Sequence, residues 1–298
     1  MRYAGEFAAL GTALCWALAS NLFARAGETM GSAILNRLRI LCAVVLLGAT
    51  SWVMHGSPWP TWATPGATGL LALSGLIGFV FGDSFYFKAL VILGPGQAAV
   101  LLSLAPAITA LIGIPVLGEH LGLRAWCGIA ITIAGVLWVV TGRRSDVAVH
   151  REGSWKVGVL AGVLGSLGQA VGYVISKQAL RTGLDPVSAT VIRVVAAAIG
   201  IGLLTISRRA VRETFTALRD RASVGFMVGG AVFGPFLGVT LSLAAIQRIE
   251  AGVAASITAC YPILAMLIAA AFGRDRLTAR ALVGAAVTVA GVVVLFTR

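Results

Sequence analysis

Ten long apolar runs, separated by short polar gaps, fill almost the whole chain. As a helix, a run of about 20 apolar residues can cross the ~30 Å hydrocarbon core of a bilayer. A backbone inside lipid must satisfy its own hydrogen bonds, so helices are what such runs can form. We therefore expect about ten transmembrane helices, near residues 7–24, 33–54, 67–87, 97–117, 125–141, 157–176, 186–206, 224–246, 253–272 and 281–296.

The composition points to the same solvent. Hydrophobic residues make up 58% of the chain and charged residues 11%, whereas about 25% of residues are charged in a soluble domain. The net charge of +12 does not indicate nucleic acid, because the basic residues stand in the gaps between apolar runs and are not interleaved with aromatics. We expect a multi-pass protein of the plasma (inner) membrane, with the lipid bilayer as a partner and no nucleic acid.

The chain also contains an internal repeat. When the sequence is shifted by 156 residues, residues 93–140 lie on 249–296 without a gap and with 15 identities in 48 positions. The matched residues include Pro106 with Pro262 and Thr132 with Thr288. At the same offset, Ser74, Gly78 and Gly82 match Gly230, Gly234 and Gly238, a small-residue stripe that lets helices pack closely.

Each repeat holds five expected helices, which is an odd number. The second repeat must therefore enter the membrane from the opposite side to the first. Inverted repeats of this kind are a frequent plan of secondary transporters. The predicted fold is an all-α membrane protein of about ten transmembrane helices, arranged as two inverted five-helix repeats in residues 1–142 and 152–298.

The ends of the two repeats carry a recognisable pattern: a mid-helix proline, an apolar run, a G-E-x-L segment at 118–121, and a Gly-rich helix ending in Ala-Gly-Val at 134–136 and 290–292. The second repeat has Gly-Arg-Asp-Arg-Leu at 273–277 in place of G-E-x-L. This pattern, with the segment GDSFYFKAL at 82–90, resembles the EamA-type transporters of the drug/metabolite transporter superfamily. The resemblance implies ten helices, a central cavity, and export or uptake of a small-molecule substrate.

The basic residues are unevenly shared between the two sides of the membrane. The loops on one side hold 14 of them, including the segment 208–221, and the other side holds 6. The positive-inside rule places the first set in the cytoplasm and both termini outside. The family resemblance implies cytoplasmic termini instead.

Asp83 is the one acid well inside an apolar run, about one turn from the end of the expected helix. A carboxylate at membrane depth is costly and usually faces protein or water. Its functional interpretation is proton coupling or substrate binding. The structural alternatives are an ion pair with Lys88 or Arg37, or a position at the membrane interface. Arg37 and Arg193 match at the repeat offset, so each could attract an anionic group or pair with Asp83, or simply reach the helix end.

Pro106 and Pro262 stand inside the fourth helix of each repeat. A helical proline removes a hydrogen bond and kinks the helix, and paired interruptions often mark a transporter's central site. The carbonyls four residues earlier, at Leu102 and Thr258, could then contact substrate. The alternative is a kink that serves packing alone.

A further set of polar and aromatic side chains is a candidate lining for a solute site. Gln169 and Tyr173 are four residues apart and so share a helix face. Such a face suits a small organic solute, although aromatics in membrane helices also serve packing and interfacial belts. The complete set is Trp16, Asn21, Gln169, Tyr173, Lys177 and Tyr261.

The sequence contains no HExxH, GxSxG or P-loop motif, and its four cysteines stand alone in apolar runs. We therefore expect no enzyme activity, no cofactor and no metal, and transport without ATP hydrolysis. The predicted function is secondary transport of small organic metabolites, such as amino acids or related solutes, by alternating access, with export as the favoured direction and proton coupling as an option. A membrane-embedded enzyme or lipid-handling protein is the main alternative, and a passive channel is a third.

Overall fold

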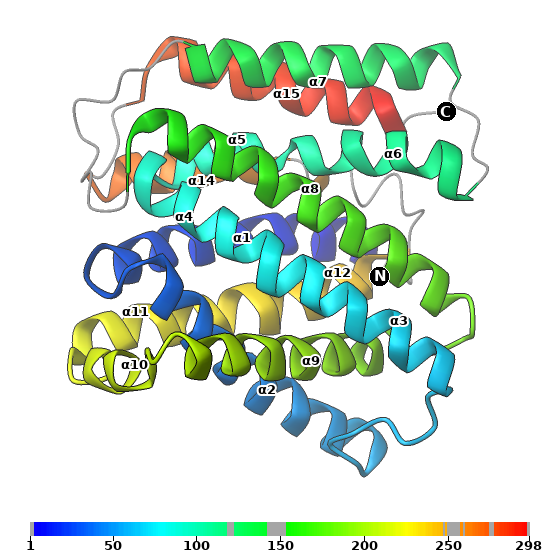
Figure 1. Ribbon diagram of the computed structural model, residues 1–298. Helices are drawn as coiled ribbons and strands as arrows, with labels where there is room; N and C mark the ends of the chain where they lie inside the picture. Colours follow the sequence, from blue (N-terminus) through cyan, green and yellow to red (C-terminus); the bar gives the residue numbers. More distant parts are fainter. Residues whose placement is uncertain are drawn as a thin grey trace.

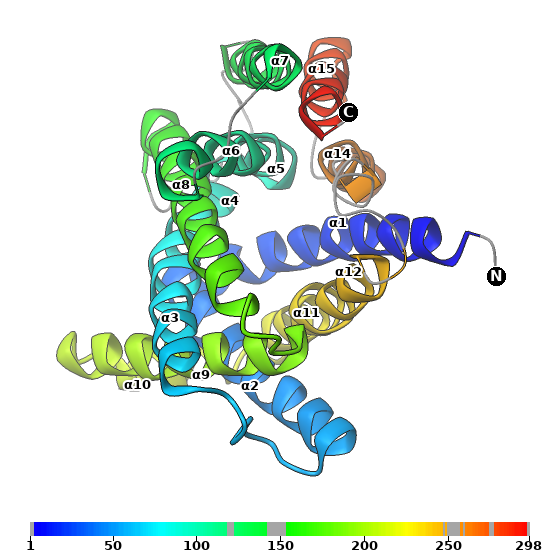
Figure 2. The ribbon, with the colours of Figure 1, turned by 90° about the vertical axis from the view of Figure 1, so that its right-hand side faces the viewer.

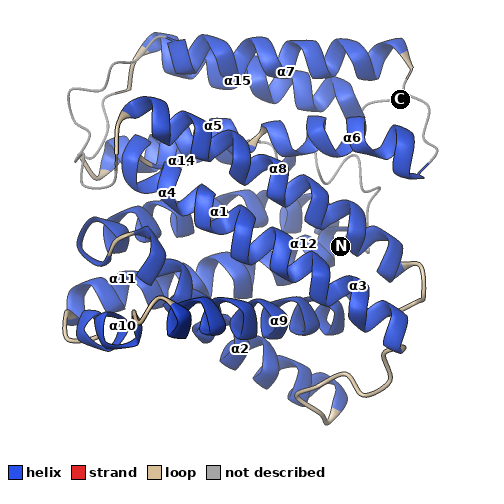
Figure 3. Cartoon of the chain, in the orientation of Figure 1, coloured by secondary structure: helices blue, strands red, loops and turns tan. Residues whose placement is uncertain are grey.

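The computed structural model describes residues 3–117, 122–141, 153–246, 248, 257–258, 260–273 and 277–296. These residues form helices joined by short loops, and none of them lies in a strand (Figure 3). The first half contains α1 (Ala4–Met30), α2 (Ser32–His55), α3 (Pro65–Gly75), η1 (Leu76–Gly82), α4 (Asp83–Leu93), α5 (Pro95–Leu102), α6 (Leu104–Leu117) and α7 (Leu123–Thr141). The second half contains α8 (Trp155–Leu180), α9 (Pro186–Ser207), α10 (Val211–Ala217), α11 (Arg221–Ala231), η2 (Val232–Gly238), α12 (Val239–Ile246), α14 (Tyr261–Ala271) and α15 (Ala279–Phe296).

Seven helical spans in this described part of the chain are long and apolar enough to cross a membrane: Ala4–Met30, Ser32–His55, Pro65–Leu93, Pro95–Val116, Trp155–Leu180, Pro186–Ser207 and Arg221–Ser242. Three shorter apolar helices, Leu123–Val139, Tyr261–Ala271 and Ala279–Leu295, lie where the other three crossings are expected. The all-helical membrane fold is therefore confirmed. The count of ten crossings stays a prediction, since residues 253–256 of the ninth expected run lie outside the described residues.

The third helix of the first half is longer than the sequence predicts. It runs without a break through α3, η1 and α4, and so ends at Leu93 instead of near residue 87. Lys88 suggests an earlier end, but its long apolar stem lets the ammonium group reach outward from inside a helix. Asp83 is consequently ten residues, or about 15 Å, from the helix end, and the prediction that placed it one turn from that end is wrong.

Both halves interrupt this third helix with a π-helical segment. The segment is η1 in the first half and η2 in the second, and the two are separated by the same 156 residues as the sequence repeat. Each contains two of the repeated glycines, Gly78 and Gly82 in η1 and Gly234 and Gly238 in η2. Short π-helical turns inside α-helices often occur at functional sites.

The two halves are interlocked, because the closest helix pairs join one half to the other. Helix α7 packs along α15 as an outer layer at the top of Figures 1 and 2. The third helix of each half packs on the first helix of the other half: η1 and α4 on α8, and η2 and α11 on α1. Helix α2 packs on α9.

Glycines on α7 and α15 show that this packing follows the repeat. A Cβ at Gly135 would overlap Thr288, and a Cβ at Gly291 would overlap Thr132. Each pair is the counterpart of the other at the offset of 156. The inverted repeat is thus visible in reciprocal contacts, where a glycine in one half lets a threonine of the other half come close.

Candidate functional site

An ion pair lies in the middle of the third helix of the first half. Asp83, the first residue of α4 after the π-helical segment, is 7% exposed and pairs with Arg39 of α2, which is 4% exposed. Buried charges of this kind are stable only when they are paired and hydrogen-bonded. The sequence offered Lys88, Arg37 or Arg193 as a partner of Asp83. The structure gives the ion pair to Arg39 instead, with Arg193 as a second cation nearby.

Gln169 connects this ion pair to the second half of the chain. Its Nε2 donates a hydrogen bond to the Asp83 carboxylate and another, of 3.4 Å, to the backbone carbonyl of Gly78 in η1. The same carbonyl accepts the backbone N–H of Asp83, five residues later, as a π-helix requires. The close approach of α8 depends on glycine, because a Cβ at Gly168 would overlap the backbone of Gly82.

Arg193 of α9 is the second cation beside Asp83. It lies near Asp83, with which it interacts electrostatically, and near the hydroxyl of Tyr173, and its guanidinium lies 4.6 Å from the centre of the Phe79 ring. Its Nε–H is buried and has no hydrogen-bond acceptor among the residues that the structure describes. One carboxylate therefore faces two guanidinium groups, and the cluster carries one positive charge in excess.

Arg39 and Arg193 are the structural counterparts of each other. Each is the eighth residue of its helix, α2 or α9, and each lies over the ring of Phe79, at 5.9 Å and 4.6 Å. The offset between them is 154, two residues shorter than the 156 of the later helices, so by position in the helix Arg193 corresponds to Arg39, whereas the sequence offset pairs it with Arg37. Arg37 is half-buried and donates a 3.1 Å hydrogen bond to Thr214 of α10.

Asn36 fixes the geometry of Arg39 and is a residue that the sequence prediction missed. Its Oδ1 accepts two hydrogen bonds from Arg39, of 3.1 and 3.2 Å. Its Nδ2 donates to the Phe79 carbonyl at 3.2 Å and to Ser84 at 3.0 Å. An asparagine three residues before an arginine on one face of an apolar helix could have been recognised as a polar pair.

The other predicted polar residues form a separate group around α1 and α14. Tyr261 shares a 3.1 Å hydrogen bond with Tyr86 of α4. Asn21 donates to the carbonyls of Ala17 and Ala265 at 2.9 and 3.0 Å, and its Oδ1 is buried without a partner in the described part of the chain.

Trp16 packs its ring against Gly234 and Gly238 of η2. Tyr173 is 59% exposed. Of the predicted residues, the structure therefore brings together Asp83, Gln169 and Arg193. Tyr261, in the other group, is linked to them through its hydrogen bond with Tyr86, which lies near Asp83 and Arg39. Trp16 and Asn21 make their contacts elsewhere, with η2 and with α14.

The two prolines are not in helix interiors, which corrects the predicted kinks. Pro106 is the third residue of α6, just after a break at Ser103, and Pro262 is the second residue of α14. The N–H groups of a first helical turn have no intrahelical partner, so a proline there loses no hydrogen bond. The interruption of the fourth helix of the first half is real, and a substrate contact at the Leu102 carbonyl stays a prediction. The acidic residues of the repeated end pattern, Glu119 and Asp275, lie outside the described residues.

Membrane-spanning helices in two interlocked repeats, with a buried polar cluster between them, are a frequent architecture of membrane transport proteins. The model of the EamA-like transporter family matches residues 3–141 and 156–297. The chain belongs to the EamA-like transporter family, a part of the drug/metabolite transporter superfamily.

Two further comparisons were made. No curated protein matches the chain. A solved structure, described only as the crystal structure of a protein, matches 99% of this chain and 96% of its own with a TM-score of 0.62 and 20% identity. At that identity the likeness shows the fold alone. The family match makes the chain a multi-pass membrane protein of a transporter family.

Proposed function

We propose that the protein is a secondary transporter of small organic solutes that works by alternating access. In this proposal the cluster of Asp83, Arg39, Gln169 and Arg193 is the solute-binding or coupling site. The observation that carries the proposal is that one buried carboxylate is held by both halves, through Arg39 of α2 and Gln169 of α8. A movement of one half against the other has to break or remake these contacts.

The packing supports a conformational change as part of the cycle. Asp83 and Arg39 are almost fully buried in this conformation, so a solute or proton from water has no direct access to them. Access requires that α8 or α9 move relative to the third helix of the first half. A second arrangement of the same repeats, with the two halves exchanging conformations, provides such a movement.

The charge of the cluster supports a class of solute. Two guanidinium groups and one carboxylate leave one positive charge, and a buried unpaired charge is costly. A carboxylate on the solute could neutralise Arg193 and accept its free Nε–H. Amino acids and related metabolites fit this requirement. A proton on Asp83 would raise the excess charge further and release Arg39, which would link anion binding to proton movement.

Export across the plasma (inner) membrane is the direction and place that we propose, on the family relationship alone. The transport proposal is tested with purified protein in proteoliposomes, by counterflow of radiolabelled amino acids and of their amine analogues without the carboxylate. Accumulation by exchange requires a carrier. Uptake that never exceeds equilibrium would indicate a channel, and no uptake of any solute would favour an enzyme or a lipid-handling protein.

Variants identify the site in the same assay. Arg193→Gln should weaken the apparent affinity for carboxylate solutes at least tenfold, because a charge-assisted hydrogen bond to a buried group contributes about 1.5–3 kcal/mol. Arg124→Gln removes an exposed arginine outside the cluster and serves as the matched control. Equal effects of the two variants would remove Arg193 from the site.

A further inference from the structure

A groove of about 660 Å³ lies between the third helix of the first half and α9. Its walls are apolar and include Leu76, Val80, Phe81 and Leu204. Three of these side chains face outward in part, with Leu76 39%, Phe81 43% and Leu204 44% exposed. Because these helices span the membrane, this wall is open to the hydrocarbon of the bilayer.

The groove is apolar at one end and basic at the other. Leu76 lies against Gly200 of α9, where a Cβ on the glycine would overlap the leucine side chain. From this contact, the third helix continues twelve residues to Lys88, and α9 continues eight residues to Arg208. The two helices cross the membrane in the same direction in the five-plus-five arrangement, so both basic residues lie beyond the same end of the groove, about 12–18 Å along.

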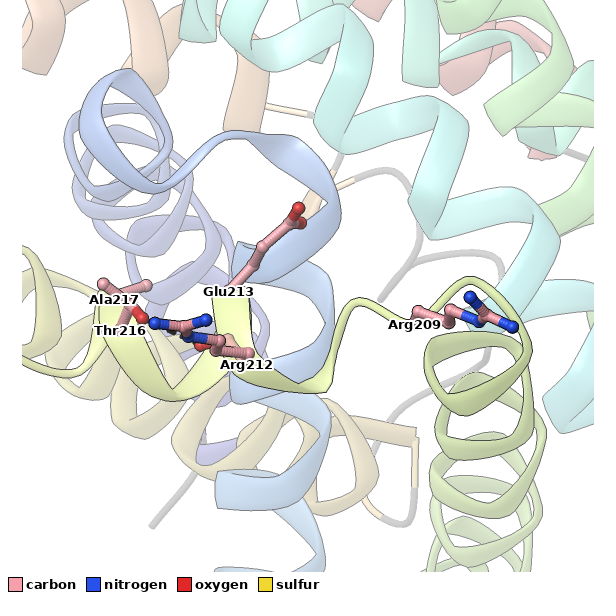
Figure 4. Close-up of a pocket in the computed structure, with 5 residues that line it drawn as sticks. All are labelled: Arg209, Arg212, Glu213, Thr216 and Ala217. Carbon is pink, nitrogen blue, oxygen red and sulfur yellow. Dashed lines mark hydrogen bonds between the residues drawn. The ribbon is translucent and has the colours of Figure 1, made fainter.

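No carboxylate lines the groove among the described residues, and neither Lys88 nor Arg208 has a salt bridge within that part of the chain. A second cavity of about 450 Å³ adjoins this end, at the turn from α9 to α10. Figure 4 shows Arg209 at the end of α9 and Arg212 on α10, on the two sides of this turn. Glu213 also lines the second cavity, and its charge interacts with Arg37.

Helix α10 places this basic end at the level of the lipid headgroups. Val211, Phe215 and Leu218 follow an i, i+4, i+7 pattern and are 40%, 67% and 40% exposed. A short helical segment with an exposed apolar stripe beside several arginines is typical of a segment that lies in the membrane interface. The groove therefore runs from hydrocarbon depth to the headgroup layer.

We propose that this groove binds an anionic phospholipid of the surrounding bilayer. An acyl chain lies along Leu76, Val80, Phe81 and Leu204, and the phosphate contacts Lys88 and Arg208. An apolar slot that ends in basic groups matches an anionic lipid in shape and in charge, and basic pockets of this kind bind anionic headgroups. The apolar walls would contribute nothing to the binding of a free anion, and two cations would attract a zwitterionic headgroup less strongly than an anionic one.

Native mass spectrometry of the full-length protein in detergent tests the proposal, with phosphatidylglycerol and phosphatidylcholine of identical acyl chains as probes. Wild type should retain phosphatidylglycerol at least tenfold more tightly. The Lys88→Gln/Arg208→Gln variant should lose about 30-fold in that affinity, because each interfacial cation contributes about 1 kcal/mol toward an anionic lipid. The matched control, Arg124→Gln/Arg181→Gln, removes the same charge from two exposed arginines outside the groove and should bind as wild type does.

Three results would overturn the proposal. Equal binding of the two lipids would mean that the headgroup is not recognised. Equal losses in the groove variant and the control would mean that only overall charge matters. Displacement of phosphatidylglycerol by inorganic phosphate at millimolar concentration would indicate a site for a free anion. If the double variant does not fold, the single Arg208→Gln change at an exposed position gives the same test, with an expected loss of about fivefold.

Discussion

The ion pair of Asp83 and Arg39 can be tested by a double-mutant cycle. Asp83→Asn keeps the shape of the side chain but removes its charge, which leaves Arg39 and Arg193 as two buried cations without a counter-ion. The side chains of the pair are only 5% and 10% exposed, so water cannot replace the lost partner. Removing one member of a buried pair typically costs about 3–5 kcal/mol. We expect Asp83→Asn to lower the free energy of unfolding by an amount in that range, since the carboxylate also accepts the hydrogen bond from Gln169.

The double variant Arg39→Gln/Asp83→Asn replaces the charged pair by two neutral amides. Its destabilisation should be smaller than the sum of the two single changes by about 2–3 kcal/mol, which is the coupling expected for residues in direct contact. Thermal unfolding in detergent, followed by the loss of monodisperse protein, measures the stability of all four proteins. The matched control is the same cycle with Arg37→Gln, because Arg37 bonds to Thr214.

The outcomes separate the structural role of the pair from its proposed role in transport. A stable double variant that no longer transports would support both the pair and the proposed site. A double variant that recovers stability and transport together would show that the pair is structural only. Additive effects of Arg39 and Asp83, or coupling to Arg37 as strong as to Arg39, would refute the assignment of the partner.

Three further predictions concern other parts of the chain. Gly75→Ala should destabilise the protein by about 1–3 kcal/mol, because the new Cβ would lie 2.8 Å from the Cα of Arg193. The control Gly202→Ala, with open space around it, should be neutral or slightly stabilising. Equal melting temperatures of the two variants in detergent would contradict this prediction. At Asp185, the residue that caps α9, burial raises the pKa of the carboxyl, but hydrogen bonds from the first turn of α9 and a nearby imidazole lower it overall. Asp185→Ala should therefore lower the stability by about 1 kcal/mol at pH 7. Thermal melts should show this difference shrinking below about pH 4, where the wild-type carboxylate takes up a proton. Ser207→Cys in a cysteine-free background should resist an impermeant thiol reagent in intact cells, as the charge bias predicts for a cytoplasmic loop, and ready labelling would reverse the orientation.

The helices and the repeat could be predicted from the sequence because the bilayer leaves few alternatives. Apolar runs of sufficient length must become helices in lipid, and a duplicated chain preserves the positions of prolines and glycines. The offset of 156 even locates the two π-helical segments, although nothing in the sequence predicts their hydrogen bonding. A glycine stripe permits close approach but does not specify the turn of the backbone.

The charged cluster could be predicted only in part, for two physical reasons. Apolar residues in lipid-facing helices are nearly interchangeable, so the sequence match cannot detect a two-residue change in offset before the third helix. At the offset of 156 Arg193 matches Arg37, whereas by its position in the helix it matches Arg39. The burial of Asn36 is the other missing element, because its role depends on the carbonyl of Phe79 and on Ser84, which come from a different helix.

The two halves of the chain are similar in fold but differ in their buried charged residues. Arg39 and Arg193 occupy equivalent places, but Asp83 has Val239 as its counterpart at the offset of 156. Two identical halves would give two conformations of equal energy in the empty protein. A single carboxylate beside two equivalent arginines makes the two conformations unequal, since only one half can supply the counter-charge. In the proposed cycle, an anionic solute at Arg193 or a proton on Asp83 changes this imbalance, and a ligand shifts a conformational equilibrium only through such a difference.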